Sequence, residues 1–363
     1  MVIETLKLEN FRNYEALDLS LDAGTNIFFG DNAQGKTNIL ESVYLCGTTK
    51  SHKGARDRDM IRFDREEAHI CMELRKHAGL YKIDMHLRKS KAKGIAINGV
   101  PIRRAAELLG IGNFVFFSPE DLGIIKNGPG QRRRFMDLEL CQLSKVYLSH
   151  LSNYNKILNQ RNRLLKDAAW HPEYMDTLDI WDAQMARYGR QVIEEREAFV
   201  ERLGEIIRPV HEKLTGSRER ICLRYESDTP GPELEERIRR MRERDLRMKT
   251  TQCGPHRDDL AFLVNDVDIR KFGSQGQQRT AALSLKLAEI ELVKQEIRDN
   301  PVLLLDDVLS ELDRNRQHYL LDSIKEIQTL ITCTGIDDFV KNQFEINRVF
   351  RVVNGTVSEK LPQ

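Results

Sequence analysis

The amino-acid sequence predicts an α/β protein with a parallel or mixed sheet, into which a largely helical subdomain is inserted. Short apolar runs followed by glycine-rich or acidic segments occur near both ends of the chain, as is typical of buried strands in α/β sheets. Between about residues 130 and 250 the apolar residues recur instead at helical spacing. We therefore expect a first lobe at 1–125, a helical lid or arm at 126–250, and completion of the first lobe by 251–363.

Composition limits the function classes. The chain has 363 residues, enough for about two domains. Its 57 basic and 56 acidic residues nearly cancel, so any contact with nucleic acid needs a local basic patch. No apolar run approaches the roughly 18 residues of a membrane span, and no signal peptide is evident, so we expect a cytoplasmic protein without membrane contacts. The six cysteines form no C-x-x-C pair and are expected to be reduced thiols.

Alternating apolar and polar residues in the first part of the chain predict half-buried strands at 17–21, 70–74 and 81–87. The dipeptide Asn98-Gly99 favours a type I′ hairpin turn. The continuous apolar run at 113–117 predicts a central buried strand, and Ser118-Pro119 after it is typical of a helix start.

Residues 135–158 and 181–206 each place apolar side chains near one helix face. They predict two antiparallel amphipathic helices or, in a sharper form, a short coiled-coil arm. His171-Pro172 is expected to mark the turn between them, and a third helix rich in Arg and Glu is expected at 232–248.

After residue 250 the sequence again predicts both strands and helices. A hairpin is expected over 260–269 around Asn265-Asp266, followed by a helix at about 276–298. Short buried strands are expected at 302–305 and 329–332.

The sharpest motif is the segment at 30–37, which matches G-x-x-x-x-G-K-[ST]. An apolar strand at 26–29 precedes it and an amphipathic helix at 37–44 follows, which is the setting that this motif requires. Its glycines let backbone N–H groups point at phosphate oxygens, and the helix directs its positive end at the same anion. Lysine would reach the β- and γ-phosphates and threonine would coordinate Mg²⁺. The expected triphosphate-binding residues are Gly30, Asp31, Asn32, Ala33, Gln34, Gly35, Lys36 and Thr37.

A second anchor for the metal is expected after the aliphatic strand at 302–305. Asp306 and Asp307 emerge where that strand ends, at the sheet edge where ligands bind in open α/β folds. Asp306 would hold Mg²⁺ through water, and Asp307 would orient or deprotonate the attacking water.

The segment 274–279 opens the helix that follows it. Ser274, Gly276 and Gln277 at a helix start can form another anion-binding surface, although an ordinary polar N-cap is an alternative interpretation. Two phosphate-type surfaces so far apart in sequence suggest that two subunits share each nucleotide.

These motifs resemble those of ABC-type ATPase heads. The segment 30–37 resembles Walker A, 274–278 the signature motif, 302–307 Walker B and 310–313 the D-loop. Four further segments are similar to those of the RecF family of recombination-repair proteins, and the resemblance extends from about residue 3 to 355. These segments are 8–14, 117–122, 132–137 and 254–260.

The resemblance implies an ATP- and Mg²⁺-dependent DNA-binding protein. It implies a head-to-tail homodimer around two ATP molecules that binds duplex DNA near single-stranded gaps. In such a dimer, Ser274 and Gly276 of one copy would contact the γ-phosphate held by Lys36 of the other, so that Ser274 and Lys36 would act in catalysis from different copies. With RecR and RecO the dimer would help to load RecA, and slow DNA-stimulated hydrolysis would open it. Two alternatives are the head of a chromosome-maintenance ATPase and the nucleotide-binding subunit of a transporter. The chain is too short for a long coiled coil plus both lobes, and transporter heads lack an insertion at 130–250.

Three positions depart from the usual ABC pattern. Glu120 stands near the place of a glutamine, Thr332 or Thr334 at the place of a histidine, and Asp307 at the place of a glutamate. All three departures favour slow turnover.

Other candidate residues are less specific. Arg12 and Asn13 could approach the base or ribose of ATP, or form only a strand-end turn. His256 is expected to structure a turn rather than to act in catalysis. Two basic clusters could bind DNA phosphates, with a solvated charged face as the alternative. Their residues are Lys50, Lys53 and Arg56 in the first, and Arg132, Arg133 and Arg134 in the second.

Overall fold

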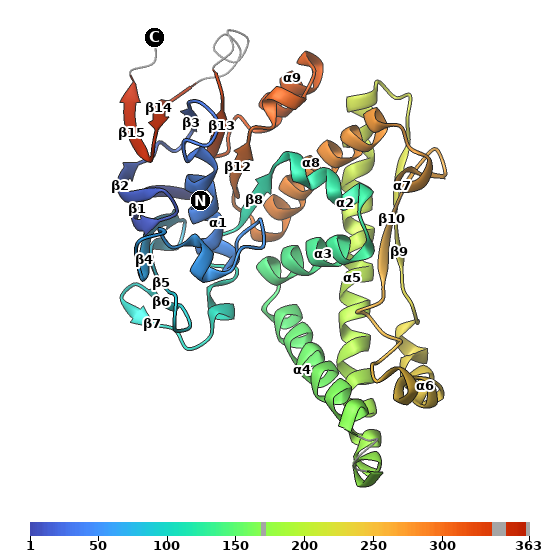
Figure 1. Cartoon of the computed structure of the whole chain (residues 1–363). Helices are drawn as coiled ribbons and strands as arrows, with labels where there is room; N and C mark the ends of the chain where they lie inside the picture. Colours follow the sequence, from blue (N-terminus) through green and yellow to red (C-terminus); the bar gives the residue numbers. More distant parts are fainter. Residues whose placement is uncertain (168–171, 336–345, 361–363) are drawn as a thin grey trace. The chain divides into compact units, whose positions relative to one another are not determined.

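The chain folds into two compact units, described by a computed structural model for residues 1–167, 172–335 and 346–360 (Figure 1). The first unit comprises Met1–Asp121 and Glu289–Gln363, and the second comprises Leu122–Ala288. We expected the insertion to end at residue 250. It continues further because the hairpin after 250 pairs with strand β9 (Ile221–Glu226) of the second unit. None of the described helices is both long and apolar enough to cross a membrane.

One six-stranded sheet of the first unit is antiparallel, in the order β2-β1-β4-β5-β6-β7. The predicted strands at 17–21, 70–74 and 81–87 are confirmed, whereas β1 was not anticipated. Asn98 and Gly99 have φ values of 51° and 78°, as a type I′ turn requires. The bounds are β1 Val2–Phe11, β2 Tyr14–Ser20, β4 Glu67–Lys76, β5 Gly79–Arg88, β6 Gly94–Ile97 and β7 Val100–Pro101.

The other six-stranded sheet is mixed, in the order β15-β14-β3-β13-β12-β8. All neighbours pair in parallel except β14 and β15. Strand β8 is buried along its whole length, but it lies at the end of this order, so its predicted central position was wrong. A continuous apolar run indicates that both faces of a strand are buried. It does not indicate whether the strand is central or at the edge of its sheet. The bounds are β3 Thr25–Phe29, β8 Phe114–Phe117, β12 Val302–Asp306, β13 Thr329–Cys333, β14 Arg348–Val353 and β15 Thr356–Lys360.

Helix α1 (Lys36–Thr48) packs against strands of both sheets, namely β4 of one and β8, β12 and β13 of the other. Eleven of its thirteen residues are buried. The helix predicted after the phosphate loop is therefore present, but it is buried nearly all round rather than amphipathic. Helix α9 (Arg314–Ser323) follows β12 in the same unit.

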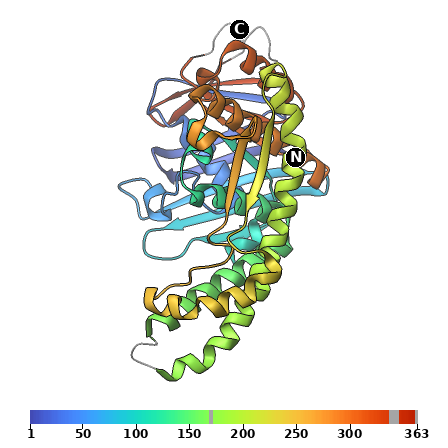
Figure 2. The ribbon, with the colours of Figure 1, turned by 90° about the vertical axis from the view of Figure 1, so that its right-hand side faces the viewer.

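The second unit is mostly helical. Helices α4 and α5 run side by side in opposite directions, and β9 lies along α5 (Figures 1 and 2). Helix α8 begins in this unit and ends among residues of the first. The bounds are α2 Leu122–Lys126, α3 Pro129–Leu143, α4 Lys145–Asp167, α5 Leu178–Thr215, α6 Leu234–Met248, α7 Ile269–Phe272 and α8 Gln275–Ile297. Strands β10 (Asp259–Val264) and β11 (Val267–Asp268) form the predicted hairpin.

The apolar periodicity at 135–158 belongs to two helices, not to one. The chain leaves helical geometry at Ser144, whose φ and ψ are −129° and 113°. The Ser144 hydroxyl then accepts a hydrogen bond from the backbone N–H of Tyr147, at 3.0 Å, and so caps α4. The antiparallel pair and the third helix are confirmed as α4, α5 and α6. The predicted turn at His171-Pro172 includes residue 171, which lies outside the described residues.

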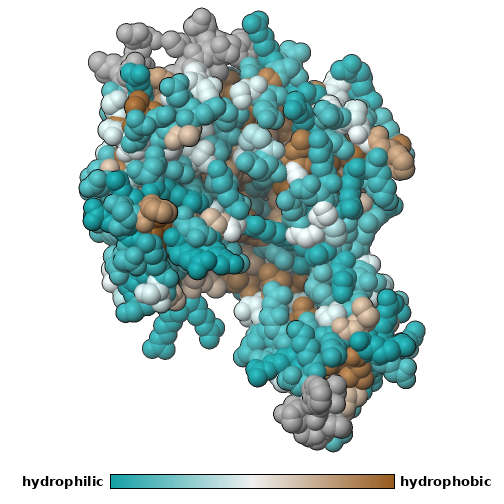
Figure 3. Space-filling view, in the orientation of Figure 1, coloured by the Kyte–Doolittle hydropathy of each residue, from teal (hydrophilic) through white to brown (hydrophobic). Residues whose placement is uncertain are grey.

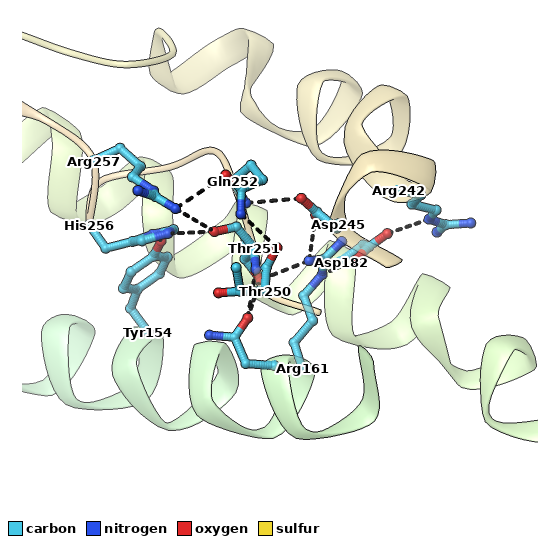
Figure 4. A network of polar contacts seen from close by, with 11 residues as sticks. Tyr154, Arg161, Asp182, Arg242, Asp245, Thr250, Thr251, Gln252, His256 and Arg257 are labelled. Carbon is cyan, nitrogen blue, oxygen red and sulfur yellow. Dashed lines mark hydrogen bonds and ion pairs between the residues drawn. The ribbon is translucent and has the colours of Figure 1, made fainter. Parts of the chain in front are cut away.

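A buried charge network fastens α4, α5 and α6 together (Figure 4). The fully buried guanidinium of Arg161 donates to Asp182 on α5, to Asp245 on α6 and to the hydroxyl of Thr251, over 2.7, 2.7 and 2.8 Å. Arg242 donates to the other oxygen of Asp182 over 2.6 Å. Burial raises the pKa of Asp245, although the hydrogen bond from Arg161 acts in the opposite direction. These five residues form what we call the Arg161 network.

The loop after α6 is attached to the same network. The ring of His256 lies between the Tyr154 hydroxyl, 2.7 Å from Nδ1, and the backbone oxygen of Thr251, 3.2 Å from Nε2. Burial lowers the pKa of His256 to about 4. The ring is therefore neutral at pH 7, and its contacts fit the tautomer with the proton on Nε2. These contacts agree with the expectation that His256 structures a turn.

We expect Arg161→Ala to destabilise the protein by about 3–5 kcal/mol, because it leaves the buried carboxylate of Asp245 without its cation and removes one of the two cations of Asp182. Thermal and urea unfolding of the full chain measure this loss. Arg163→Ala removes an arginine that is 79% exposed on the same helix, and should change the unfolding midpoint little. Equal midpoints for the two variants would contradict the stabilising role of the network.

Candidate functional site

The phosphate loop lies between β3 and α1, as the sequence predicts. Gly35 has φ 113°, and a Cβ there would come within 2.6 Å of the Asn13 side chain. Asn13 donates from Nδ2 to the backbone oxygen of Gln34 over 2.9 Å and accepts from Asn38 over 2.8 Å. Asn13 thus holds the loop from outside, and this close approach requires glycine at position 35.

Lys36 turns its side chain back into the loop. Its Nζ donates to the backbone oxygens of Gly30 and Asp31, each over 2.7 Å. The side chain is largely buried, so the positive charge lies within the curl of the loop rather than in solvent. Together with the N-terminus of α1, this places positive potential where the motif predicts a phosphate group.

The two predicted metal-binding residues meet although 269 residues separate them. The Thr37 hydroxyl donates to Asp306 Oδ1 over 2.7 Å, and Thr332 at the end of β13 donates to the same oxygen over 2.7 Å. Hydroxyl and carboxylate oxygens are hard donors, which Mg²⁺ prefers. The donor set therefore fits Mg²⁺, with Thr37 and Asp306 as the residues that would hold it.

Asp307 has an unusual backbone and an unpaired side-chain oxygen. Its φ is 53°, in the left-handed region that non-glycine residues rarely adopt. The backbone N–H of Asp307 donates to the hydroxyl of Thr332 over 3.1 Å and to the backbone oxygen of Thr332 over 3.2 Å. Among the described residues, the buried Oδ1 has no hydrogen-bond partner. Local strain and a buried polar atom without a partner are both typical of functional positions.

Sequence reasoning missed a buried ion pair behind the loop. Glu41 on α1 accepts two hydrogen bonds from Arg12, over 2.8 and 2.9 Å, and one from the hydroxyl of Ser51. Burial acts to raise the pKa of Glu41, but the hydrogen bonds from Arg12 and Ser51 outweigh it and hold the pKa below its usual value. The remaining terminal nitrogen of Arg12 donates to the backbone of Asp59. Arg12 is thus committed to these contacts, and its proposed approach to a nucleotide stays a prediction.

The first basic cluster lies on a loop that hydrogen bonds and an ion pair hold in place. Lys50, Lys53 and Arg56 are exposed, whereas Ser51 and His52 turn inward. Lys93 fastens the loop, since its Nζ donates to the backbone oxygen of Thr49 over 2.5 Å and pairs with Asp57 over 2.9 Å. The loop therefore presents its cations from a fixed base.

His52 lies beneath this loop, and its ring stacks on Phe116 of β8 at 4.1 Å between centroids. Burial lowers the pKa of His52 to about 4. Nearby Glu120, just beyond β8, is exposed. Burial works against its ionisation, but the hydrogen bond with Ser118 and the charges of Lys53 and His52 hold its pKa below the usual value. Glu120 is therefore ionised at pH 7, and its place near that of the glutamine of ABC heads stays a prediction.

The second basic cluster differs from the prediction. Arg132 is almost fully buried and pairs with both oxygens of Asp259, over 2.6 and 2.9 Å. It therefore cannot contact DNA in this fold, and the prediction for Arg132 was wrong. Arg133 is half-buried and donates to the backbone of Asp258, while Arg134 is exposed. The run looked like a solvent-facing patch because sequence does not show the acidic partner, which follows 127 residues later.

The signature-like segment forms a reciprocal helix cap in the second unit. The Ser274 hydroxyl accepts from the backbone N–H of Gln277 over 3.2 Å, and Gln277 Oε1 accepts from the backbone of Ser274 over 2.9 Å. Gln277 also donates to Glu219 over 3.0 Å, and Glu219 lies 3.3 Å from the buried ring of His211. Ser274 and Gly276 are exposed, so this end of α8 is accessible to a second molecule.

A phosphate loop after β3, two acids at the end of a strand of the same sheet and a serine-led helix define the class of the protein. This is the ABC-type ATPase head.

Comparisons with known proteins narrow the class. A model of the RecF/RecN/SMC N terminal domain matches residues 2–358. The DNA replication and repair protein RecF of Agathobacter rectalis is 61% identical over 98% of this chain and 99% of its own length. RecF of Lachnoclostridium phytofermentans is 57% identical over 99% of this chain and 100% of its own. The chain belongs to the RecF family.

Solved structures agree with this assignment. The structure of the recombination mediator protein RecF-ATP in the RecFOR pathway has a TM-score of 0.94 and 34% identity, and the match covers 99% of this chain and 98% of that one. An Smc head bound to the C-winged helix domain of ScpA has a TM-score of 0.58 and 16% identity, over 99% and 97% of the two chains. This second likeness concerns the fold alone.

We expect Glu41→Gln to lower the free energy of unfolding by about 1–3 kcal/mol at pH 7, because charge-assisted hydrogen bonds to Arg12 are lost. The pKa of Glu41 is lower in the folded protein than in the unfolded one. Its stabilisation is therefore complete above the unfolded pKa of about 4.3 and is lost as the pH falls through the folded pKa. Melting temperatures of wild type and variant should begin to converge as the pH falls below the unfolded pKa of about 4.3 and should meet below the folded pKa. The exposed control Glu9→Gln should show little difference at any pH, and a constant gap for Glu41→Gln would contradict the assignment.

Proposed function

We propose that this protein is an ATP-driven, DNA-binding switch of recombinational repair. The observation that carries the proposal is the hydrogen bond between Thr37 and Asp306, which joins the phosphate loop to the acidic end of β12. A loop that binds phosphate alone has no need for an acid at this position. The pairing supports a site for a triphosphate together with its metal ion.

The residues have distinct proposed roles. Backbone N–H groups at 30–37 and the ammonium of Lys36 bind the phosphates, and Thr37 and Asp306 hold Mg²⁺. The metal ion, when bound, neutralises charge on the phosphate oxygens. Asp307 orients the attacking water with the side-chain oxygen that has no partner among the described residues. Its short side chain, Glu120 and Thr332 in place of the usual groups support slow hydrolysis.

We propose that two copies share each ATP in a head-to-tail dimer. Ser274, Gly276 and Gln277 of one copy would complete the site that Lys36 forms in the other. Their exposure supports this, since the cap at the start of α8 leaves the serine and glycine accessible. Binding of ATP would thus close the dimer, and hydrolysis would open it.

The relatives' names and the solved structures support the biological context. The curated relatives are DNA replication and repair proteins, and the related structures are of a recombination mediator in the RecFOR pathway. We propose that the dimer clamps duplex DNA near single-stranded gaps and, with RecR and RecO, helps to load RecA.

Two variants test the shared site. Lys36→Met should abolish ATP binding, because the buried ammonium is lost from the loop. Ser274→Arg should leave ATP binding intact but prevent dimerisation, because the bulky side chain blocks only the surface offered to the other copy. Equilibrium dialysis measures ATP binding, and light scattering with ATP measures the dimer, with and without gapped duplex DNA.

A dimer that persists in Ser274→Arg would exclude sharing through this segment. Wild type that stays monomeric with saturating ATP, on a hydrolysis-blocked background, would contradict the clamp as a whole.

The first basic cluster provides a separate prediction. Replacing Lys50, Lys53 and Arg56 together by Gln should weaken duplex binding and make the slope of log K against log salt shallower by about 2.7, or 0.9 for each contact. The control replaces Lys82, Lys91 and Arg103, also exposed in the first unit. Fluorescence anisotropy over a salt series measures both quantities. Equal slopes for both triple variants would remove the cluster from the DNA site.

A further inference from the structure

Helix α6 carries an excess of positive charge that the functions above do not use. Residues 234–249 contain seven basic and four acidic residues, an excess of three, whereas the whole chain has an excess of one. The helix belongs entirely to the second unit. The arginines on the two faces of this helix differ in exposure and in their ion pairs.

The inner face is apolar or fully paired. Leu234 and Ile238 are buried, and Asp245 and Arg242 are held in the Arg161 network (Figure 4). Arg242 also pairs with Asp179 on α5. The inner charges are thus neutralised within the protein, and the helix is attached rigidly to α4 and α5.

The outer face carries four arginines in a row, at successive spacings of three, four and three residues. Such spacing places them on one side of a helix, over about 15 Å of its length. All four are exposed, and only Arg240 has an acidic partner within the described part of the chain, Glu236. These residues, which we call the outer arginine row, are Arg237, Arg240, Arg244 and Arg247.

We propose that the outer arginine row binds the phosphate backbone of duplex DNA. This inference rests on the proposed function and assigns a DNA-contacting surface to the second unit. Guanidinium groups suit phosphate oxygens because their donors form a planar fork. The anchored inner face fixes the helix, so the row meets the backbone without ordering a flexible segment.

Nucleic acid fits the row better than an acidic protein surface does. Duplex DNA presents about one negative charge per 1.7 Å of its axis, so a 15 Å row faces several phosphates at once. A protein interface instead needs an apolar centre with aromatic or aliphatic anchors. The row contains no such residue. Met248, which follows Arg247, is an exposed apolar side chain, but the surface around α6 is mostly hydrophilic (Figure 3).

The test replaces Arg237, Arg244 and Arg247 together by Gln in the full chain. The matched control replaces Arg163, Arg187 and Arg190, exposed arginines of α4 and α5 in the same unit, so that both variants lose the same charge. Binding to a gapped duplex with ATP is measured by anisotropy at several salt concentrations. We expect at least about a tenfold loss of affinity for the row variant and a slope shallower by about 2.7, with both nearly unchanged in the control.

Each other outcome overturns the inference. Equal losses in both triple variants would show a general charge effect. Wild-type affinity in the row variant, while Lys50, Lys53 and Arg56 remain necessary, would remove only the row and leave the proposed function standing. Loss of binding to poly-L-glutamate with unchanged DNA binding would assign the row to an acidic protein. No duplex binding by wild type would overturn both the inference and the proposed function. Circular dichroism and ATP binding confirm that both variants are folded.

Discussion

The hydrogen bond between Thr37 and Asp306 is the contact on which the ATPase unit depends. It requires β3, β12 and β13 to be neighbours in one sheet and α1 to begin beside their ends. Burial of α1 between two sheets makes this possible, because the helix then has little freedom to shift. The ion pair between Arg12 and Glu41 ties the same helix to the end of β1. The geometry of the site is therefore a property of the packed core and not of the loop alone.

The second unit is organised around buried charge rather than a purely apolar centre. Arg161, Arg196 and Arg132 are all nearly inaccessible, and each meets at least one aspartate. Removing charges from water is costly, so such pairs stabilise only while every partner is present. These ion pairs nevertheless specify which helices pack together, because any other packing would leave a buried charge without a partner. An arm built in this way keeps the orientation of surface residues such as those on α6.

Local sequence patterns predicted much of the fold. The features that they did not predict depend on residues that are distant in sequence. The alternation at 70–74 and 81–87, the Asn98-Gly99 turn and the loop at 30–37 each depend on neighbouring residues, and the structure contains all of them. The sequence did not predict the helix break at Ser144, because the apolar residues before and after it continue at helical spacing. The burial of Arg132 depends on Asp259, and that of Glu41 on Arg12. Both partners are distant in sequence, so no local pattern reveals them.

The hydroxyl of Thr332 serves both acids of the site at once. It donates to the carboxylate of Asp306 and accepts from the backbone N–H of Asp307, so a single oxygen links the last residue of β12 and the residue after it to the neighbouring strand. Among small side chains, the alcohols of serine and threonine can both donate and accept in this way, and the β-branch of threonine limits its rotation further. The carboxyl group of Asp306 and the backbone of Asp307 are therefore both held by Thr332, which fixes the direction in which the chain leaves β12. Natural variation at position 332 should accordingly be confined to side chains that bear an alcohol.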